Sequence, residues 1–130
     1  MPAVSEKGQI YRCNICGNMY EVLRVGGGTP SCCEQELEQL KEKTEGVKEM
    51  EMKHIPIVEE TETAIRVKIG ETIHPMTKEH HIEWIQIIAN GEQRRKYLDP
   101  EQEPIAKFEI AKEEIEKVRE FCNIHGLWTA

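Results

Sequence analysis

Apolar and polar residues alternate along the second half of the chain, which is the pattern of strands that bury one face. The runs are HIPIVEE (54–60), AIRVKIG (64–70), HIEWIQIIA (81–89), RRKYL (94–98) and AKFEIA (106–111). Turn-forming pairs separate some of them, such as Asn90-Gly91 and Asp99-Pro100. Several short strands in one domain-sized stretch predict an antiparallel sandwich or barrel, so the expected fold class is mainly β.

One segment of this half departs from the strand pattern. IAKEEIEKVREFC (110–122) is rich in helix-forming residues and has Glu-to-Lys spacings that stabilise helices. Local propensity alone therefore predicts a helix here.

The N-terminal part is short and alternates weakly. QIYRC (9–13) and NMYEVLRV (18–25) precede three glycines at 26–28, which predicts a short hairpin on each side of a glycine loop. A piece of about forty residues buries too little apolar surface to fold alone and needs a staple. The charged stretch 35–52 is expected to be a linker with some helix. We therefore expect two domains, at 1–45 and 46–130.

Charge and composition exclude some classes of function. The 130 residues carry a formal net charge of -7, and basic residues cluster only at Arg94, Arg95 and Lys96, so nucleic acid is not an expected partner. The opening residues lack an apolar signal core, and no apolar run approaches the ~20 residues of a membrane span. We therefore expect a cytoplasmic protein with reduced thiols, in which five cysteines and five histidines indicate metal binding.

Four of the cysteines form two close pairs in the first 33 residues. Cys13 and Cys16 make a CxxC motif, and after fifteen intervening residues come Cys32 and Cys33. Four thiolates can converge on one tetrahedral zinc or iron ion. The alternatives are two disulfides or four structural thiols, which the compartment and the CxxC turn disfavour. A bound metal would also supply the missing staple, because its binding free energy becomes folding free energy.

The remaining cysteine and all five histidines lie later in the chain, at His54, His74, His80, His81, Cys122 and His125. Successive residues of a strand point to opposite faces, so at most one of His80 and His81 should join a compact site. A turn after Cys122 is needed to bring His125 to the same side. Imidazoles with one thiolate suit iron, copper or zinc. Four nitrogens and one sulfur exceed the four ligands of structural zinc, which favours iron with one open position.

These motifs resemble those of desulfoferrodoxin, the two-iron class of superoxide reductase. CxxC followed by CC is similar to its desulforedoxin-like N-terminal centre, and KHIP, HPMTKEHHIEWI and CNIHG are similar to its catalytic motifs. The resemblance implies a seven-stranded immunoglobulin-like sandwich, in which VREFC is a strand. It also implies two irons per chain, one held by Cys13, Cys16, Cys32 and Cys33 and one held by His54, His74, His80, Cys122 and His125. His81 stands where the family commonly has tyrosine.

The implied activity is the one-electron reduction of superoxide to hydrogen peroxide, without release of oxygen. Reduced rubredoxin or a similar small redox protein would supply the electron, and a homodimer is implied. Lys53 matches the lysine beside the open iron position, where its charge would attract superoxide. Family members often have glutamate directly before this lysine; here that residue is Met52, with Glu51 one place earlier. We therefore expect no glutamate ligand to the oxidised iron. The alternative is a non-enzymatic iron or zinc protein, acting as an electron carrier or interaction module.

Overall fold

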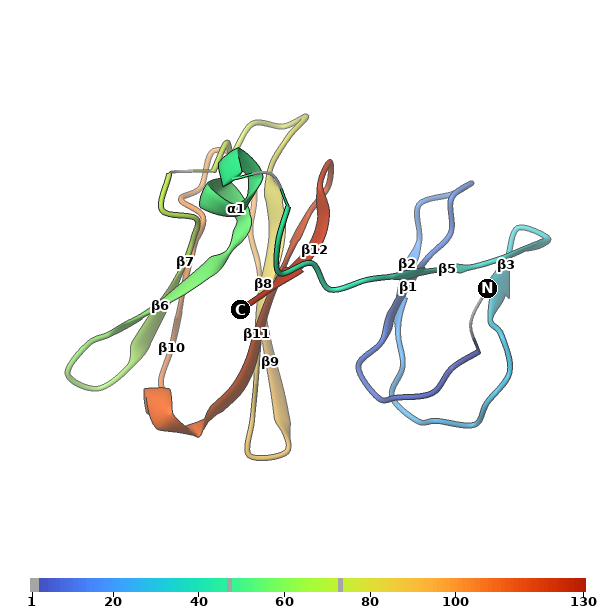
Figure 1. The fold of residues 1–130 in the computed structure, drawn as a ribbon, viewed down its shortest axis with the longest axis horizontal. Coiled ribbons are helices and arrows are strands. Elements are labelled where there is room, and N and C mark those ends of the chain that lie inside the picture. Colours follow the sequence, from blue (N-terminus) through green and yellow to red (C-terminus); the bar gives the residue numbers. More distant parts are fainter. Residues whose placement is uncertain (1–2, 47, 73) are drawn as a thin grey trace. The chain divides into compact units, whose positions relative to one another are not determined.

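The computed structural model describes residues 3–46, 48–72 and 74–130, and the chain divides into two compact units, Met1–Lys41 and Glu42–Ala130. Each unit has its own sheets (Figure 1).

The first unit is built from very short strands. A three-stranded sheet has the order β2-β1-β5, and a separate hairpin pairs β3 with β4. The bounds are β1 Ile10–Arg12, β2 Met19–Glu21, β3 Ser31–Cys32, β4 Gln35–Glu36 and β5 Glu38–Leu40. The β1–β2 and β3–β4 hairpins lie on either side of the glycine loop, as expected. Its core cluster contains Tyr11, Cys13 and Leu37, too few residues to stabilise a fold unaided.

The expected linker at 35–52 is only partly a linker. Its first residues form β4 and β5, because Glu38–Leu40 pair with β1 and complete the small sheet. Its last residues begin α1 (Lys48–His54), so the expectation of some helix is met.

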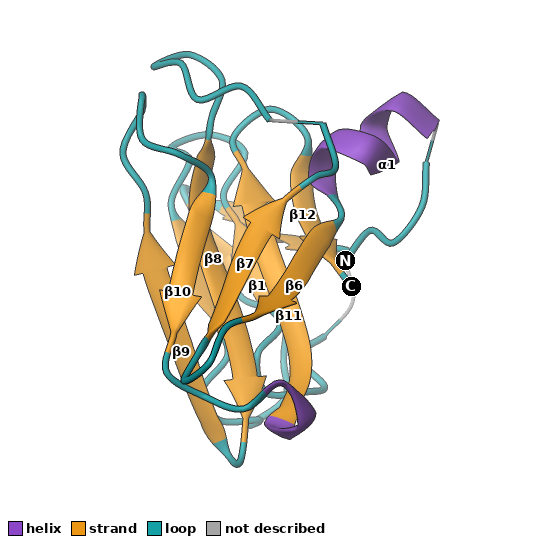
Figure 2. Ribbon diagram, turned by 90° about the vertical axis from the view of Figure 1, so that its left-hand side faces the viewer, coloured by secondary structure: helices purple, strands orange, loops and turns teal. Residues whose placement is uncertain are grey.

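The second unit is a two-layer sandwich of antiparallel sheets (Figure 2). One sheet has the order β10-β7-β6 and the other the order β12-β11-β8-β9. The bounds are β6 Pro56–Glu60, β7 Ile65–Ile69, β8 Ile82–Ala89, β9 Glu92–Tyr97, β10 Ile105–Phe108, β11 Ile115–Cys122 and β12 Gly126–Thr129. Three and four strands together give the seven-stranded sandwich that the resemblance implies.

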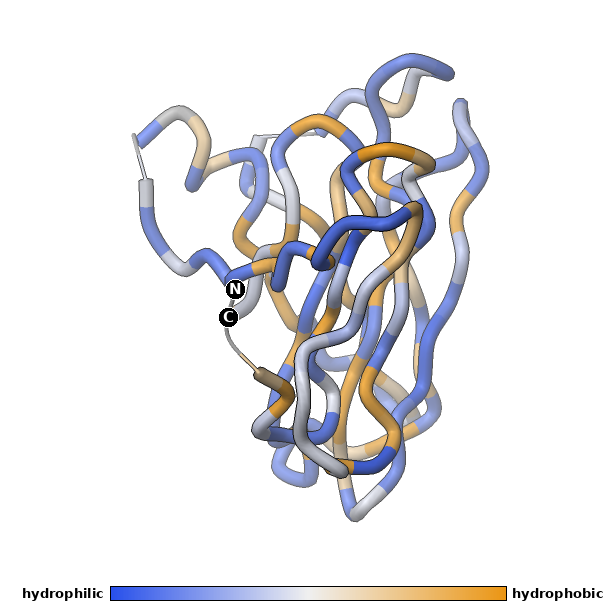
Figure 3. Tube along the Cα trace, turned by 90° about the vertical axis from the view of Figure 1, so that its right-hand side faces the viewer, coloured by the Kyte–Doolittle hydropathy of each residue, from blue (hydrophilic) through white to orange (hydrophobic). Residues whose placement is uncertain are grey.

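Period-two alternation builds the core of this sandwich. Ile65, Val67 and Ile69 of β7 are fully buried, whereas Arg66 between them is exposed. Hydrophobic and hydrophilic residues follow one another along the strands in the same way (Figure 3). Between β8 and β9 the predicted turn at Asn90-Gly91 is present, with φ of 50° and 74°. Such a pair of left-handed residues matches the twist of the two strands it joins.

The helix predicted at 110–122 from propensity is wrong. Only a 3-10 turn, Lys112–Glu114, is present, and Ile115–Cys122 form β11. This strand pairs with β8 on one side and with β12 on the other, so nearly all of its backbone groups are satisfied by its neighbours. Tertiary pairing therefore outweighs local helix propensity.

A short segment before α1 also joins the second unit. Lys43 forms a parallel bridge with β12: its N–H donates to Leu127 O (2.9 Å), and its carbonyl accepts from Thr129 N–H (3.0 Å). The carboxylate of Glu42 pairs with Lys117 and, at 3.1 Å, with Arg119 of β11. We call residues 42–43 the strap.

Candidate metal centres

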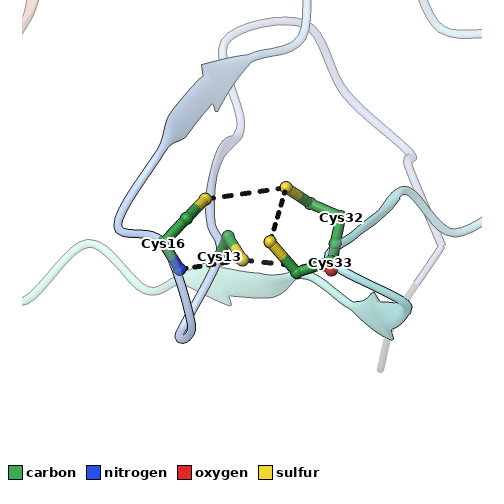
Figure 4. Close-up of side chains that lie close together, drawn as sticks. All are labelled: Cys13, Cys16, Cys32 and Cys33. Carbon is green, nitrogen blue, oxygen red and sulfur yellow. Dashed lines mark hydrogen bonds between the residues drawn. The ribbon is translucent and has the colours of Figure 1, made fainter.

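The four N-terminal cysteines come from two tight turns. Cys13 and Cys16 occupy the turn between β1 and β2, and Cys32 and Cys33 lie where β3 turns into β4. In the first turn Gly17 has φ 82° and its N–H donates to Cys13 O at 2.9 Å. In the second turn Cys33 has φ 52°, which lets it follow Cys32 without continuing the strand. Both turns aim their thiols inward (Figure 4).

The sulfur geometry fits one tetrahedral metal. The Sγ atoms of Cys16 and Cys32 are 3.7 Å apart, those of Cys32 and Cys33 are 3.8 Å apart, and all four lie within 4.8 Å of one another. A tetrahedral ion with metal–sulfur bonds of about 2.3 Å sets sulfur–sulfur distances of about 3.8 Å. A disulfide would need about 2.05 Å, and all four thiols are free.

The thiols are also electrostatically coupled. Backbone N–H groups of Cys16 and Ile15 lower the pKa of Cys13 to about 6. The pKa of Cys33 is raised to about 12 by the neighbouring side chains of Cys32, Cys13 and Cys16. Four thiolates this close repel one another, so full ionisation needs a cation among them.

The second group gathers from four separate places in the sandwich. His54 ends α1, His74 and His80 lie in the loop between β7 and β8, Cys122 ends β11, and His125 lies in the turn before β12. The four imidazoles form a closed ring, with centroid distances of 4.5 Å (His54–His74), 4.8 Å (His74–His80), 5.0 Å (His80–His125) and 4.9 Å (His125–His54). Neighbouring rings are steeply inclined, at 63° to 82°, as rings that present their edges to one centre would be.

Partners on the outer side of two of the rings fix which nitrogen faces the centre. His54 Nδ1 is 3.3 Å from Glu120 Oε2, and His74 Nδ1 donates to Pro75 O at 2.6 Å, so Nε2 of each remains. His54 Nε2 lies 3.1 Å from His125 Nδ1, and Cys122 Sγ lies 3.5 Å from His74 Nε2. Two nitrogens at right angles around one ion, with metal–nitrogen bonds of about 2.1 Å, would be about 3.0 Å apart. The donor set therefore fits a metal.

His80 belongs to the ring but stands slightly apart from the other donors. The donor atoms of His54, His74, Cys122 and His125 lie within 4.8 Å of one another, and His80 is outside that set. Its Nε2 is nevertheless buried without a hydrogen-bond partner, as a metal-binding nitrogen would be. His81 Nδ1 is also buried without a partner, so ring contacts are what distinguish the two histidines. The backbone N–H of His81 donates to Asn123 Oδ1 at 2.9 Å.

Burial keeps the imidazoles in their metal-binding form. Burial, with smaller contributions from neighbouring charges, lowers the pKa of His54 to about 3 and that of His74 to about 4. It lowers the pKa of His125 as well. All three are therefore neutral at pH 7 and have a lone pair to donate. Burial raises the pKa of Cys122, so the thiolate that binds metals requires a cation beside it.

Three residues that sequence reasoning missed hold these ligands in place. Glu120 is fully buried, its pKa is raised well above the ordinary value by burial, and it contacts His54. Trp128 stacks on His54 at 4.9 Å and donates its Nε1–H to His125 O at 3.1 Å. Lys43 Nζ donates to the same carbonyl at 2.9 Å. Only Glu120 had a sequence signal, because it lies two residues before Cys122 on the same face of a strand.

A close backbone contact positions the end of α1. Gly70 has φ 80°, and a Cβ there would lie 2.6 Å from the carbonyl oxygens of Met52 and Lys53. The N–H of Gly70 donates to Ile55 O at 3.1 Å, and that of Thr72 donates to Met52 O at 3.0 Å. The turn after β7 therefore packs directly on the residues that precede His54.

Two charged residues near the end of α1, Lys53 and Glu51, have different surroundings. Lys53 lies in the last turn of α1 directly before His54, and its positive charge helps to lower the pKa of His74, His80 and His125. The carboxylate of Glu51 accepts a hydrogen bond from Gly46 N–H at 3.1 Å.

Within the described residues, no helix is long and apolar enough to cross a membrane.

Comparisons with known proteins cover both units. A family model described as desulfoferrodoxin matches residues 46–130, and one for the desulfoferrodoxin N-terminal domain matches residues 5–40. A desulfoferrodoxin homolog of Methanothermobacter thermautotrophicus is 48% identical over 125 residues, 96% of this chain and 99% of the relative. A superoxide reductase of Thermococcus kodakarensis is 34% identical over 94 residues, 58% of this chain and 82% of the relative. The crystal structure of the superoxide reductase from Treponema pallidum superposes with a TM-score of 0.72 at 25% identity, over 94% of this chain and 95% of the other.

Proposed function

Because the chain belongs to the desulfoferrodoxin family, we propose that it is a superoxide reductase that reduces superoxide to hydrogen peroxide at the ring of four histidines and Cys122. The observation that carries this proposal is the convergence of four imidazoles and one buried thiol on a single centre. Such a mixed nitrogen and sulfur set, with more donors than structural zinc takes, suits a redox-active iron.

Each residue of the centre has a role that follows from its surroundings. His54, His74, His80, His125 and Cys122 would hold one iron, and Cys13, Cys16, Cys32 and Cys33 would hold a second. Bound ferrous iron would supply the electron for superoxide. The Cys122 thiolate would donate electron density to that iron, and the backbone N–H of His125, 3.4 Å from the Cys122 sulfur, would reduce this donation.

The positive charge of Lys53 would attract the substrate to the site. Superoxide is an anion and the chain is acidic, with a net charge of -7, so a local cation is needed to attract it. Lys53 follows Met52 at the end of α1 and supplies that charge next to His54. With Glu51 turned to Gly46, we propose that no carboxylate of this segment binds the oxidised iron.

The activity requires superoxide and a redox donor. We propose reduced rubredoxin or a similar small protein as the donor, a homodimer as the assembly and the cytoplasm as the location. The four-cysteine centre staples the small first unit, whose own core is minimal.

Two variants at different centres test the proposal. Cys122→Ser should remove the thiolate-to-iron absorption band and the oxidation of pre-reduced protein by superoxide, while the four-cysteine centre stays filled. Cys33→Ser is the matched control, and it should disturb the first centre and leave superoxide oxidation in place. Full activity in Cys122→Ser would contradict the assignment. Protein that takes up only zinc when iron is supplied would favour the non-enzymatic alternative.

A further inference from the structure

The edge of the sandwich between β9 and β10 carries a cluster of positive charge. A hollow of 470 Å³ is lined by Arg94, Arg95, Lys96, Lys107, Phe108 and Glu109. Four of these six residues are cationic, on a chain whose net charge is -7. We call this surface the basic edge. A local field opposite in sign to the rest of the molecule selects partners of negative charge.

Aromatic rings hold two of these cations. The Arg95 guanidinium lies 4.4 Å from the centroid of Trp84, and Lys96 Nζ lies 5.3 Å from the centroid of Phe108. Contact with a ring face fixes the position of a cation without removing its charge. Arg94 is partly compensated, because it pairs with Glu92 at 3.5 Å and donates to Glu109 O at 3.0 Å. The basic edge therefore keeps a positive field in a fixed geometry.

An aromatic row leads from this edge to the second metal centre. Tyr97 of β9 is opposite Trp84 of β8, and Trp84 is opposite Phe121 of β11. Tyr97 is 74% exposed, whereas the rings of Trp84 and Phe121 stack 6.0 Å apart at 20°. Phe121 is bonded directly to Cys122. Tyr97, Trp84 and Phe121 thus form a row on one face of the sheet, from an exposed ring to the residue that the backbone joins to Cys122.

We propose that the basic edge is the docking surface for an acidic electron-donor protein, and that the electron enters through Tyr97, Trp84 and Phe121 to Cys122. This rests on the proposed function, because only a reductase needs its iron reduced again. The donor loses one electron, the ferric ion at the second centre gains it and becomes ferrous, and no bond forms or breaks. The rings serve as the medium between the two centres and are not themselves oxidised.

Reversal of exposed charges tests the docking surface. The double variant Lys96→Glu/Lys107→Glu alters two exposed side chains of the basic edge, and Lys7→Glu/Lys112→Glu, also exposed, makes the same change of net charge elsewhere. The probe is rubredoxin, zinc-substituted for equilibrium binding and reduced for electron transfer. We expect the first variant to raise the Kd about tenfold or more and to lose most of its salt dependence, and the control to change it much less. Equal affinities for the two variants would overturn the docking surface.

A second variant separates binding from electron entry. Tyr97→Leu should lower the limiting rate of iron reduction at saturating reduced rubredoxin, and an unchanged limiting rate would refute the aromatic route. The reaction of pre-reduced protein with superoxide should be the same in all three variants and in the parent. If the pre-reduced parent itself fails to react with superoxide, the proposed function fails, whatever the binding data show.

Discussion

Adding one methyl group at Gly70 should displace the end of α1 that carries Lys53 and His54. Gly70 has φ 80°, and the new Cβ would lie 2.6 Å from two carbonyl oxygens of that helix end. These are backbone atoms, so no flexible side chain can move aside. Gly91 is a matched control in the same unit, with φ 74° and nothing within 4 Å of a Cβ.

The two substitutions share one cost and differ in the other. A left-handed conformation costs a residue with a Cβ about 1–2 kcal/mol, and both alanine variants incur it. Overpacking against fixed atoms adds about 1–3 kcal/mol, and only Gly70→Ala incurs that. We therefore expect the free energy of unfolding to fall by about 2–5 kcal/mol in Gly70→Ala and by about 1–2 kcal/mol in Gly91→Ala.

Thermal unfolding followed by tryptophan fluorescence measures the difference. Both tryptophans, Trp84 and Trp128, lie in the second unit, so the signal reports that unit alone. Each kcal/mol shifts the midpoint of a domain this size by about 4–8 °C, so Gly70→Ala should melt at least about 4 °C below Gly91→Ala. Its iron absorption band should also shift, because His54 moves. Equal midpoints and an unshifted band would refute the close contact as a positioning device.

Three further changes probe the same centre. Glu120→Gln replaces the buried carboxyl group beside His54 with an amide of the same shape, and should weaken iron affinity about 10–100-fold in a chelator competition; unchanged affinity would show that the contact does not support the ligand. Lys53→Met should slow the oxidation of pre-reduced protein by superoxide and flatten its dependence on ionic strength, and a parent-like salt dependence would exclude a steering role. In metal-free protein the pKa values of His54 and His74 are about 3 and 4, below the ordinary 6.5, so the unfolded chain binds more protons as pH falls below about 6.5. Urea unfolding should therefore show stability falling from pH 6.5 toward 4, with a smaller fall in His54→Gln; identical slopes in the two proteins would contradict it.

The predictable parts of the fold are those with a local pattern. The runs at 64–70 and 81–89 alternate clearly, and β7 and β8 lie within them. The strand predicted at 54–60 begins too early, because His54 ends α1 and β6 starts only at Pro56. Local propensity does not predict β11 as a strand, because its pairing with β8 and β12 depends on residues distant in sequence. The family resemblance supplied what local composition could not.

The residues of the candidate site also fall into those that the sequence predicts and those that only the structure shows. Cysteine and histidine are infrequent in this chain and most fall in short motifs, so the sequence alone indicates Cys13, Cys122 and their partners as metal ligands. The residues that orient them are ordinary ones, such as Trp128 and Lys43, and their contacts exist only once strands and turns have packed. No composition or spacing distinguishes such residues from any other tryptophan or lysine.

The strap shows that a sequence module and a compact structural unit need not share a boundary. The family match to the second part begins at residue 46, after Glu42 and Lys43. A chain cut there would lose a carboxylate partner of Arg119, which is only 2% exposed, and would leave the edge of β12 open to pairing with other chains. Recombination that joined this catalytic module to a different N-terminal partner would therefore have to carry the strap with it.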